Sequence, residues 1–96
     1  MIIIIYPGET YTIQATFKDN KGLLFDPDTH EITLHTPNGE IVETKTTPTK
    51  ESLGVFTTSF NIPTTGREGV WFIMWTMRKG GRIDAERHLF KVRKLD

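Results

Sequence analysis

Apolar and polar residues alternate along several short segments of this chain. The clearest is 10–18, where apolar residues occupy every second position: Tyr11, Ile13, Ala15 and Phe17. Successive side chains of a β-strand point to opposite faces of a sheet, so this pattern predicts a strand that is buried on one side. No segment shows a sustained helical period. The pattern therefore indicates an all-β protein.

Further strands are predicted where apolar runs lie between turn signals. Such signals recur about every 8 to 12 residues, a spacing typical of a sandwich or a barrel. Besides 10–18, the predicted strands cover residues 2–6, a segment with Ile32 and Leu34 facing inward, 41–45, 55–62, 70–77 and 83–93. Residues 46–54 are predicted to form a polar loop. We expect an antiparallel β-sandwich of about seven strands.

Two of the turn signals predict hairpins. The first is Pro37-Asn38-Gly39-Glu40, in which Asn-Gly favours the positive φ angles of a type I′ turn. The second is Lys79-Gly80-Gly81-Arg82, which joins the last two predicted strands.

The segment 70–77 is apolar on both of its faces. Trp71, Ile73 and Trp75 occupy one face, and they are predicted to fill the space between the two sheets. The other face carries Val70, Phe72 and Met74, and Leu89 of the next strand is predicted to lie beside them. A strand of this kind is either covered on its outer side or available for contact there.

The composition limits the possible classes of protein. A length of 96 residues predicts one domain over 1–96. Hydrophobic residues make up 36% and charged residues 25% of the chain, as in folded proteins, and the absence of cysteine excludes disulfides and thiolate metal sites. The run Ile2 to Ile5 has no preceding Lys or Arg and is too short for a signal peptide, and no run reaches the about 18 apolar residues of a membrane span. We expect a complete small protein without a signal peptide and without membrane contact.

The formal net charge of zero conceals an uneven distribution along the chain. Residues 1–66 carry eight acidic and four basic residues, whereas residues 67–96 carry four acidic and eight basic residues. Such asymmetry could attract an anionic partner or favour head-to-tail association. The preferred interpretation is that the folded sandwich interleaves the two halves, because strands distant in sequence lie side by side.

A series of short motifs resembles a known family. In order, they are Tyr6-Pro7-Gly8-Glu9, Phe25-Asp26-Pro27-Asp28-Thr29, Pro37-Asn38-Gly39, Leu53-Gly54-Val55-Phe56, Phe60-Asn61-Ile62-Pro63 and Gly69-Val70-Trp71. The chain resembles the immunoglobulin-like, macroglobulin-type β-sandwich modules of bacterial and archaeal surface proteins. It resembles more closely the short stand-alone proteins of this pattern encoded among virion-assembly genes of tailed bacteriophages and prophages. The resemblance implies a non-enzymatic structural or binding module and transfers no catalytic residues and no cofactor.

The acidic turns and the histidines are the candidate metal ligands of this chain. Asp26, Asp28 and Glu31, with Asp19 nearby, supply oxygen ligands that would suit calcium, but the spacing of an EF-hand loop is missing. Asp-Pro-Asp as a turn is the preferred interpretation, with calcium as a minor alternative. His30 and His35 lie five apart on one predicted strand and face opposite ways, so they cannot share a zinc ion, and His88 can join only one of them.

Catalysis and nucleic-acid binding are not favoured by the sequence. Ser52 and Ser59 lack the Gly-x-Ser-x-Gly elbow of a nucleophile, and the carboxylates are scattered over turns. Basic residues do gather in the last two predicted strands: Arg78, Lys79, Arg82, Arg87, Lys91, Arg93 and Lys94. Aromatics among bases can track a phosphate backbone, but Asp84 and Glu86 interrupt this set, so solvated surface bases are the preferred interpretation.

We therefore hypothesise a structural, protein-binding role as a component or assembly accessory of a virus particle, located in the virion or the host cytoplasm. The first candidate surface is the sheet face with Phe72, Met74 and Leu89. The second is the isoleucine strand, whose exposed edge would pair with another chain: Ile2, Ile3, Ile4 and Ile5. Both surfaces predict an oligomer or an obligate protein partner. The alternative is a carbohydrate-binding or adhesive module of a cell surface, for which Tyr6, Phe25 and Phe72 are the available aromatics.

Overall fold

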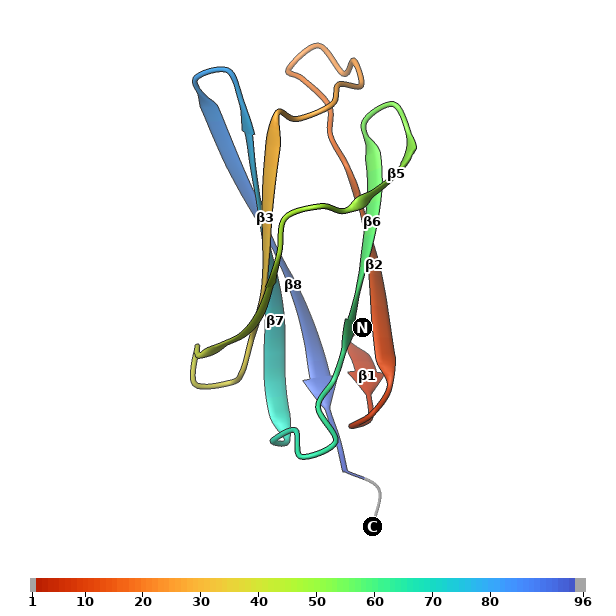
Figure 1. Ribbon diagram of the computed structural model, residues 1–96, viewed down its shortest axis with the longest axis vertical. Coiled ribbons are helices and arrows are strands. Elements are labelled where there is room, and N and C mark those ends of the chain that lie inside the picture. Colours follow the sequence, from red (N-terminus) through yellow and green to blue (C-terminus); the bar gives the residue numbers. More distant parts are fainter. Residues whose placement is uncertain (1, 95–96) are drawn as a thin grey trace.

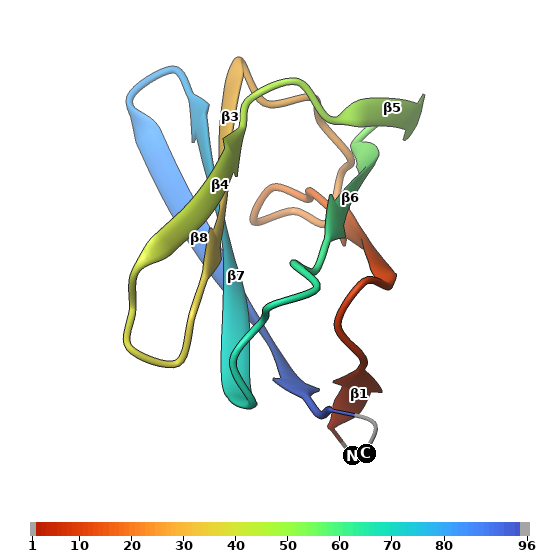
Figure 2. The same ribbon diagram turned by 60° about the horizontal axis from the view of Figure 1, so that its bottom comes forward.

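The computed structural model describes residues 2–94, which form eight β-strands in two stacked sheets (Figure 1). The five-stranded sheet has the order β1 (Ile3–Ile5), β8 (Arg82–Val92), β7 (Gly69–Lys79), β3 (Thr29–His35) and β4 (Ile41–Lys45). The three-stranded sheet has the order β2 (Thr10–Thr16), β6 (Val55–Asn61) and β5 (Thr49–Ser52). Figure 2 shows the two layers side by side. The predicted all-β sandwich is confirmed, and within residues 2–94 no helix is present that could cross a bilayer.

The core lies between the two sheets and is built from the alternating residues of each strand. Trp71, Ile73 and Trp75 of β7 are at most 2% exposed, as the pattern predicted. The other strands, with the residues directly after β2 and β6, contribute the residues predicted to face inward: Tyr11, Ile13, Ala15, Phe17, Ile32, Leu34, Phe56, Phe60, Ile62, Phe90 and Val92. Met77 extends the buried face of β7 by one more residue. Period-two alternation thus identified the core correctly.

The structure contains one strand more than expected. Residues 46–54 were predicted to be a polar loop, but Thr49–Ser52 form β5 and pair with β6. All four residues of β5 are exposed, so no apolar alternation marks this strand in the sequence. Backbone pairing at the sheet edge forms it instead, and such pairing leaves no hydrophobic signal.

The hairpin between β3 and β4 uses a turn of a different type from the one predicted. A type I′ turn needs a positive φ at both central residues, but no residue other than glycine has a positive φ within 2–94. Thr36 O accepts the N–H of Gly39 at 2.9 Å, and Gly39 alone has φ near 86°. This is a type I turn followed by a glycine bulge. Pro37 favours it because its ring holds φ near the value that position i+1 requires.

The isoleucine strand is paired within the molecule. β1 runs parallel to β8, with Ile3, Ile4 and Ile5 in register with Phe90, Lys91 and Val92. Ile5 packs against the core, whereas Ile2, Ile3 and Ile4 remain 41–48% exposed. One edge of this strand is therefore satisfied by β8. The other edge forms the border of the five-stranded sheet.

The molecule is elongated because β7 and β8 extend beyond the strands of the facing sheet. β7 and β8 each contain 11 residues, whereas β2 and β6 each contain 7. Four additional residues correspond to about 13 Å of strand, and the overall extents are 48 × 23 × 22 Å. The β7–β8 hairpin and the loop between β2 and β3 lie at the same end (Figure 1). The inner face of β8 is therefore only partly covered near this hairpin.

Candidate functional site

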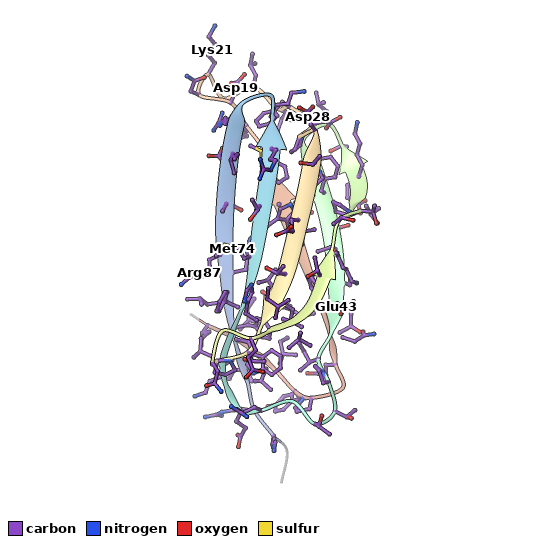
Figure 3. The ribbon with its side chains drawn as sticks, turned by 60° about the vertical axis from the view of Figure 1, so that its left-hand side comes forward. Asp19, Lys21, Asp28, Glu43, Met74 and Arg87 are labelled. Atoms are coloured by element: carbon purple, nitrogen blue, oxygen red, sulfur yellow. The ribbon has the colours of Figure 1, made fainter. Side chains whose placement is uncertain are left out.

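The outer face of the five-stranded sheet carries a continuous row of apolar side chains. Phe72 of β7 is in register with Leu89 of β8 on one side and with His35 of β3 on the other. Met74 is in register with Arg87, and Figure 3 shows these two side chains next to one another on this face. The structure thus brings together Phe72, Met74 and Leu89, as their alternation predicted.

Phe72 lies between a histidine and an arginine. Its ring stacks on the His35 imidazole at a centroid distance of 4.3 Å and an interplanar angle of 9°. The Arg87 guanidinium carbon lies 4.8 Å from the centroid of the same ring. His35 is held in place by its own contacts, since Nε2 lies 2.7 Å from Thr33 Oγ1 and Nδ1 lies 3.2 Å from Gly39 O. The aromatic ring is therefore half-buried and preorganised.

The isoleucine strand continues this apolar face at the sheet edge. Ile4 is in register with Lys91, which in turn is in register with Val70. Val70 is 46% exposed, Leu89 is 52% exposed and Ile4 is 41% exposed. The two surfaces that the sequence suggested separately therefore meet on one side of the sheet. We call Ile4, Val70, Phe72, Met74 and Leu89 the outer patch.

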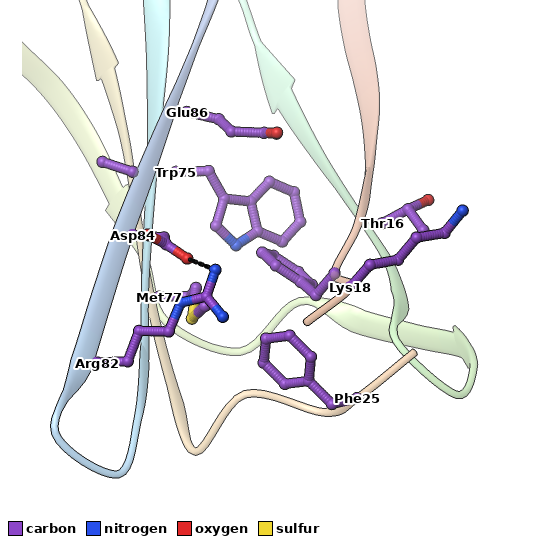
Figure 4. Close-up of a pocket in the computed structure, with 10 residues that line it drawn as sticks. Thr16, Lys18, Phe25, Trp75, Met77, Arg82, Asp84 and Glu86 are labelled. Atoms are coloured by element: carbon purple, nitrogen blue, oxygen red, sulfur yellow. Dashed lines mark ion pairs between the residues drawn. The ribbon is translucent and has the colours of Figure 1, made fainter. Parts of the chain in front are cut away.

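A cleft of about 300 Å³ opens between β8 and β2, and we call it the side cleft (Figure 4). Five residues supply its apolar lining: Phe17, Phe25, Trp75, Met77 and Ala85. Arg82, Asp84 and Glu86 line it from β8, and Arg82 Nη2 lies 2.7 Å from Asp84 Oδ2. The Arg82 guanidinium carbon also lies 6.0 Å from the centroid of the Phe25 ring.

The side cleft was not predicted from the sequence. The sequence feature that indicates this cleft is a change from apolar to charged residues among the inward-facing positions of β8. Phe90 and Val92 are buried at one end of the strand, whereas Arg82, Asp84 and Glu86 occupy the equivalent inward positions at the other end. A switch from apolar to charged residues at a constant period of two indicates that the facing layer ends there.

The acidic residues considered for calcium stabilise turns. Asp26 accepts the ammonium of Lys50 at 2.6 Å and the N–H of Gly54 at 2.8 Å, and these bonds lower the pKa of its carboxyl group. Asp28 accepts the N–H of Gly80 at 2.9 Å, which lowers its pKa together with the nearby charge of Lys79.

The other two acidic residues lie apart from this pair. Asp19 closes its own loop by accepting the N–H groups of Lys21 and Leu23. Glu31 lies on the outer face opposite Thr76. Residues 2–94 contain no group of three possible ligands arranged around one point.

The three histidines lie in different places. His30 faces the core and His35 faces outward, as predicted from their spacing, and His88 of β8 lies beside Glu86. His30 Nδ1 accepts the indole N–H of Trp75 at 3.1 Å. Burial lowers the pKa of His30, and the nearby charge of Asp26 opposes this shift. His30 is therefore neutral in the fold and serves packing.

The basic residues of β7 and β8 are divided between two faces. Lys79 lies 3.5 Å from Asp28, and Arg82 is paired with Asp84. Arg87 and Lys91 occur on the outer face, where Arg87 covers Phe72. The Lys79–Asp28 pair links the basic half of the chain to the acidic half, as the interleaved interpretation predicted.

The serines contribute to the sheets. Ser59 Oγ lies 2.7 Å from Thr12 Oγ1, and Ser59 O accepts the ammonium of Lys45. Ser52 is the last residue of β5. Neither hydroxyl is hydrogen-bonded to a histidine in the described part of the chain. A histidine beside the hydroxyl, which would activate it as a nucleophile, is therefore missing at both serines within residues 2–94.

Comparison with known proteins identifies the family. The MG2 domain model matches residues 4–92, so this chain belongs to the MG2 domain family. MG2 domains are non-catalytic, immunoglobulin-like modules of macroglobulin-type proteins. No curated protein sequence gives a significant match.

Solved structures show the same fold in longer and in similar-sized chains. Salmonella α2-macroglobulin matches with a TM-score of 0.80 and 16% identity over 99% of this chain, which corresponds to 6% of that protein. The native conformation of Escherichia coli α2-macroglobulin matches with a TM-score of 0.78 and 16% identity, covering 96% of this chain and 5% of that one. CopC from Methylosinus trichosporium OB3b has a TM-score of 0.65 and 14% identity, covering 99% of this chain and 86% of that one. The immunoglobulin-like, macroglobulin-type fold is confirmed, and these matches carry no information on a phage origin.

Proposed function

We propose that this chain is a non-enzymatic protein-binding module that contacts a partner protein through the outer patch. The observation that carries the proposal is the exposure of the patch, since Val70, two residues before Phe72 on β7, is 46% exposed and Leu89, the partner of Phe72 on β8, is 52% exposed. Covering apolar groups that are in contact with water lowers the free energy of the complex by about 25 cal/mol per Å² of apolar surface buried.

The chemistry of the patch is typical of protein interfaces. Aromatic residues, methionine and arginine are enriched in interface centres, and the patch combines Phe72 and Met74 with the adjacent Arg87. The His35 and Arg87 contacts already orient the Phe72 ring, so binding requires little further ordering of this side chain. Lys91 between Ile4 and Val70 adds a positive charge, which favours an acidic group on the partner.

The α2-macroglobulin likeness supports one setting for such a contact. This chain spans about 6% of those proteins, and a domain within a long chain has neighbouring domains against which it can pack. In this setting the outer patch would be buried against another module.

The virion setting is supported by the order of turn motifs in the sequence. Mass spectrometry of purified particles from the source organism tests it, because a virion component must be recovered in a fixed ratio to the capsid protein. Recovery of the chain only from the host cytoplasm or cell surface would contradict it.

Carbohydrate binding is less favoured by the arrangement of aromatic residues. A carbohydrate platform needs several aromatic faces in one surface. Phe25 lines the side cleft, Phe72 lies on the outer face and Tyr6 belongs to the turn between β1 and β2. These three rings therefore do not form a common platform.

The proposal is tested by placing charge on the outer patch. In the double variant Phe72→Glu with Leu89→Glu, the mass measured by light scattering should fall to that of a monomer if the chain self-associates. If the wild type is already monomeric, binding to a partner identified by cross-linking and mass spectrometry should be lost. The matched control is Thr12→Glu with Gln14→Glu, which adds the same charge to the exposed face of the three-stranded sheet. Equal assembly or binding by both double variants would refute the outer patch.

A further inference from the structure

One edge of β8 is open over most of its length. The strand contains 11 residues, and β7 pairs with all of them from Arg82 to Val92. On its other side β1 covers only Phe90, Lys91 and Val92. In the described part of the chain, no strand pairs with this side between Arg82 and His88. The open segment is long enough to accept a further strand, since strands contain about 5 to 6 residues on average.

The backbone groups that face this edge follow from the register. Arg93 donates its N–H to Ile5 O at 3.1 Å, so its N–H points to the side on which β1 lies. Backbone groups of an antiparallel strand alternate between its two sides. The N–H and C=O groups of Ile83, Ala85 and Arg87 therefore point to the same edge as those of Arg93. They present an alternating series of donors and acceptors to an added strand.

The open edge borders the side cleft. Asp84 and Glu86 of β8 line the cleft, and its volume of about 300 Å³ is bounded on the opposite side by Thr16 and Lys18. Figure 4 shows the Trp75 ring between these two walls. Every second side chain of a strand added to β8 would point toward this layer. One such side chain would enter the cleft above Trp75 and Phe25.

The charges at the cleft favour an apolar side chain there. Arg82 already pairs with Asp84, and His88 Nε2 lies 3.5 Å from Glu86 Oε2. A charged side chain would have to compete with the Arg82–Asp84 ion pair. An apolar residue would instead cover Phe25, the one aromatic of the lining that is only partly buried, which is favourable because it removes apolar surface from water.

We propose that β8 accepts an extended segment of a partner protein as an additional strand along Ile83–Arg87, with one apolar side chain of that segment inserted into the side cleft. This surface is separate from the outer patch, and either can exist without the other. The partner segment is defined by its chemistry, namely alternating apolar and small polar residues without a charge at the inserted position. Backbone pairing supplies the affinity, and the cleft selects the side chain.

The test uses a soluble peptide probe and the full chain. The probe is an acetylated and amidated peptide of alternating threonine and leucine with a lysine at each end. Nuclear magnetic resonance titration should shift the amide signals of Ile83, Ala85 and Arg87 and the indole signal of Trp75. The indole signal of Trp71, which donates to Arg67 O instead, is the internal reference and should not move.

Two changes examine the backbone pairing directly. Ala85→Pro removes one N–H from the open edge and should weaken probe binding about tenfold. Two versions of the probe, N-methylated on alternate residues in opposite phase, require no change in the protein. Only the version whose methyl groups face β8 should fail to bind.

The outcomes separate this proposal from the outer patch. Phe72→Glu with Leu89→Glu should leave probe binding unchanged. Equal binding of both N-methylated probes, shifts confined to other strands or no binding at millimolar probe would overturn the proposal. Dimerisation of the chain alone that is abolished by Ala85→Pro would show that a second copy, and not a partner segment, occupies the edge.

Discussion

Both faces of β7 carry apolar residues, but the two faces differ in how far these residues are buried. Trp71, Ile73 and Trp75 on the inner face are at most 2% exposed, whereas Val70 on the outer face is 46% exposed. Both faces look alike in the sequence, because each carries three large apolar residues at a period of two. They differ in what lies opposite. The three-stranded sheet covers the inner face, whereas side chains such as His35 and Arg87 partly cover the outer one. Hydrophobic patterning thus identifies a core only where a second layer is present.

The difference between the two faces predicts that a truncation on the inner face causes the largest loss of stability. Trp75→Ala removes a fully buried ring and its hydrogen bond to His30, and it should lower the free energy of unfolding by about 3–5 kcal/mol. Denaturant unfolding followed by fluorescence of the remaining tryptophan measures the loss. The neighbouring variant Met74→Ala on the outer face is the control and should lose less than half as much. Similar losses in both variants would show that the two faces are equally packed.

A smaller effect is expected from pH at the inner face. Burial lowers the pKa of folded His30 below the ordinary value of 6.5. The neutral imidazole therefore contributes stability that is complete above that value and is lost as the pH falls through the lower pKa of the folded state. His30→Gln should reduce the loss of stability that thermal unfolding detects between pH 7 and pH 5. A wild-type slope in His30→Gln would contradict the assignment.

Truncation of the outer aromatic ring should cost less than truncation of a core ring. Phe72→Ala removes the contacts with His35 and Arg87 and should lower stability by about 1 kcal/mol, as expected for a cross-strand aromatic on a sheet surface. Equilibrium unfolding in urea would measure this change. A loss as large as that of Trp75→Ala would mean that the outer face is a second core.

The smallest effect is predicted at the exposed edge of the outer patch. Val70→Thr keeps the branched shape of the side chain and a high strand propensity, so stability should change by less than about 0.5 kcal/mol. Thermal unfolding measures this change, while partner binding through the patch should weaken. A large loss of stability would show that Val70 already packs within the molecule.

Much of the fold could be predicted from local patterns. Tyr11, Ile13 and Phe17 were placed in the core because their alternation is uninterrupted. The register of Phe72 with Leu89 followed from the short Gly80-Gly81 turn, which sets the pairing of β7 and β8. In contrast, β5 has no apolar face, and the Asn38-Gly39 turn took a different geometry because Pro37 precedes it. Both differences arise from interactions that the period of two does not include.

The amino-acid sequence by itself determined seven of the eight strands within residues 2–94, which of their side chains point inward and that β7 is apolar on both faces. These properties depend on residues two positions apart, and they hold wherever the strand is placed. Only the tertiary structure decided that β1 pairs in parallel with the end of β8, that the edge from Arg82 to His88 remains open and that the side cleft forms between β8 and β2. The physical reason is that these features depend on which strands become neighbours and on how far each layer reaches over the other. Such long-range packing leaves no periodic mark in any single segment.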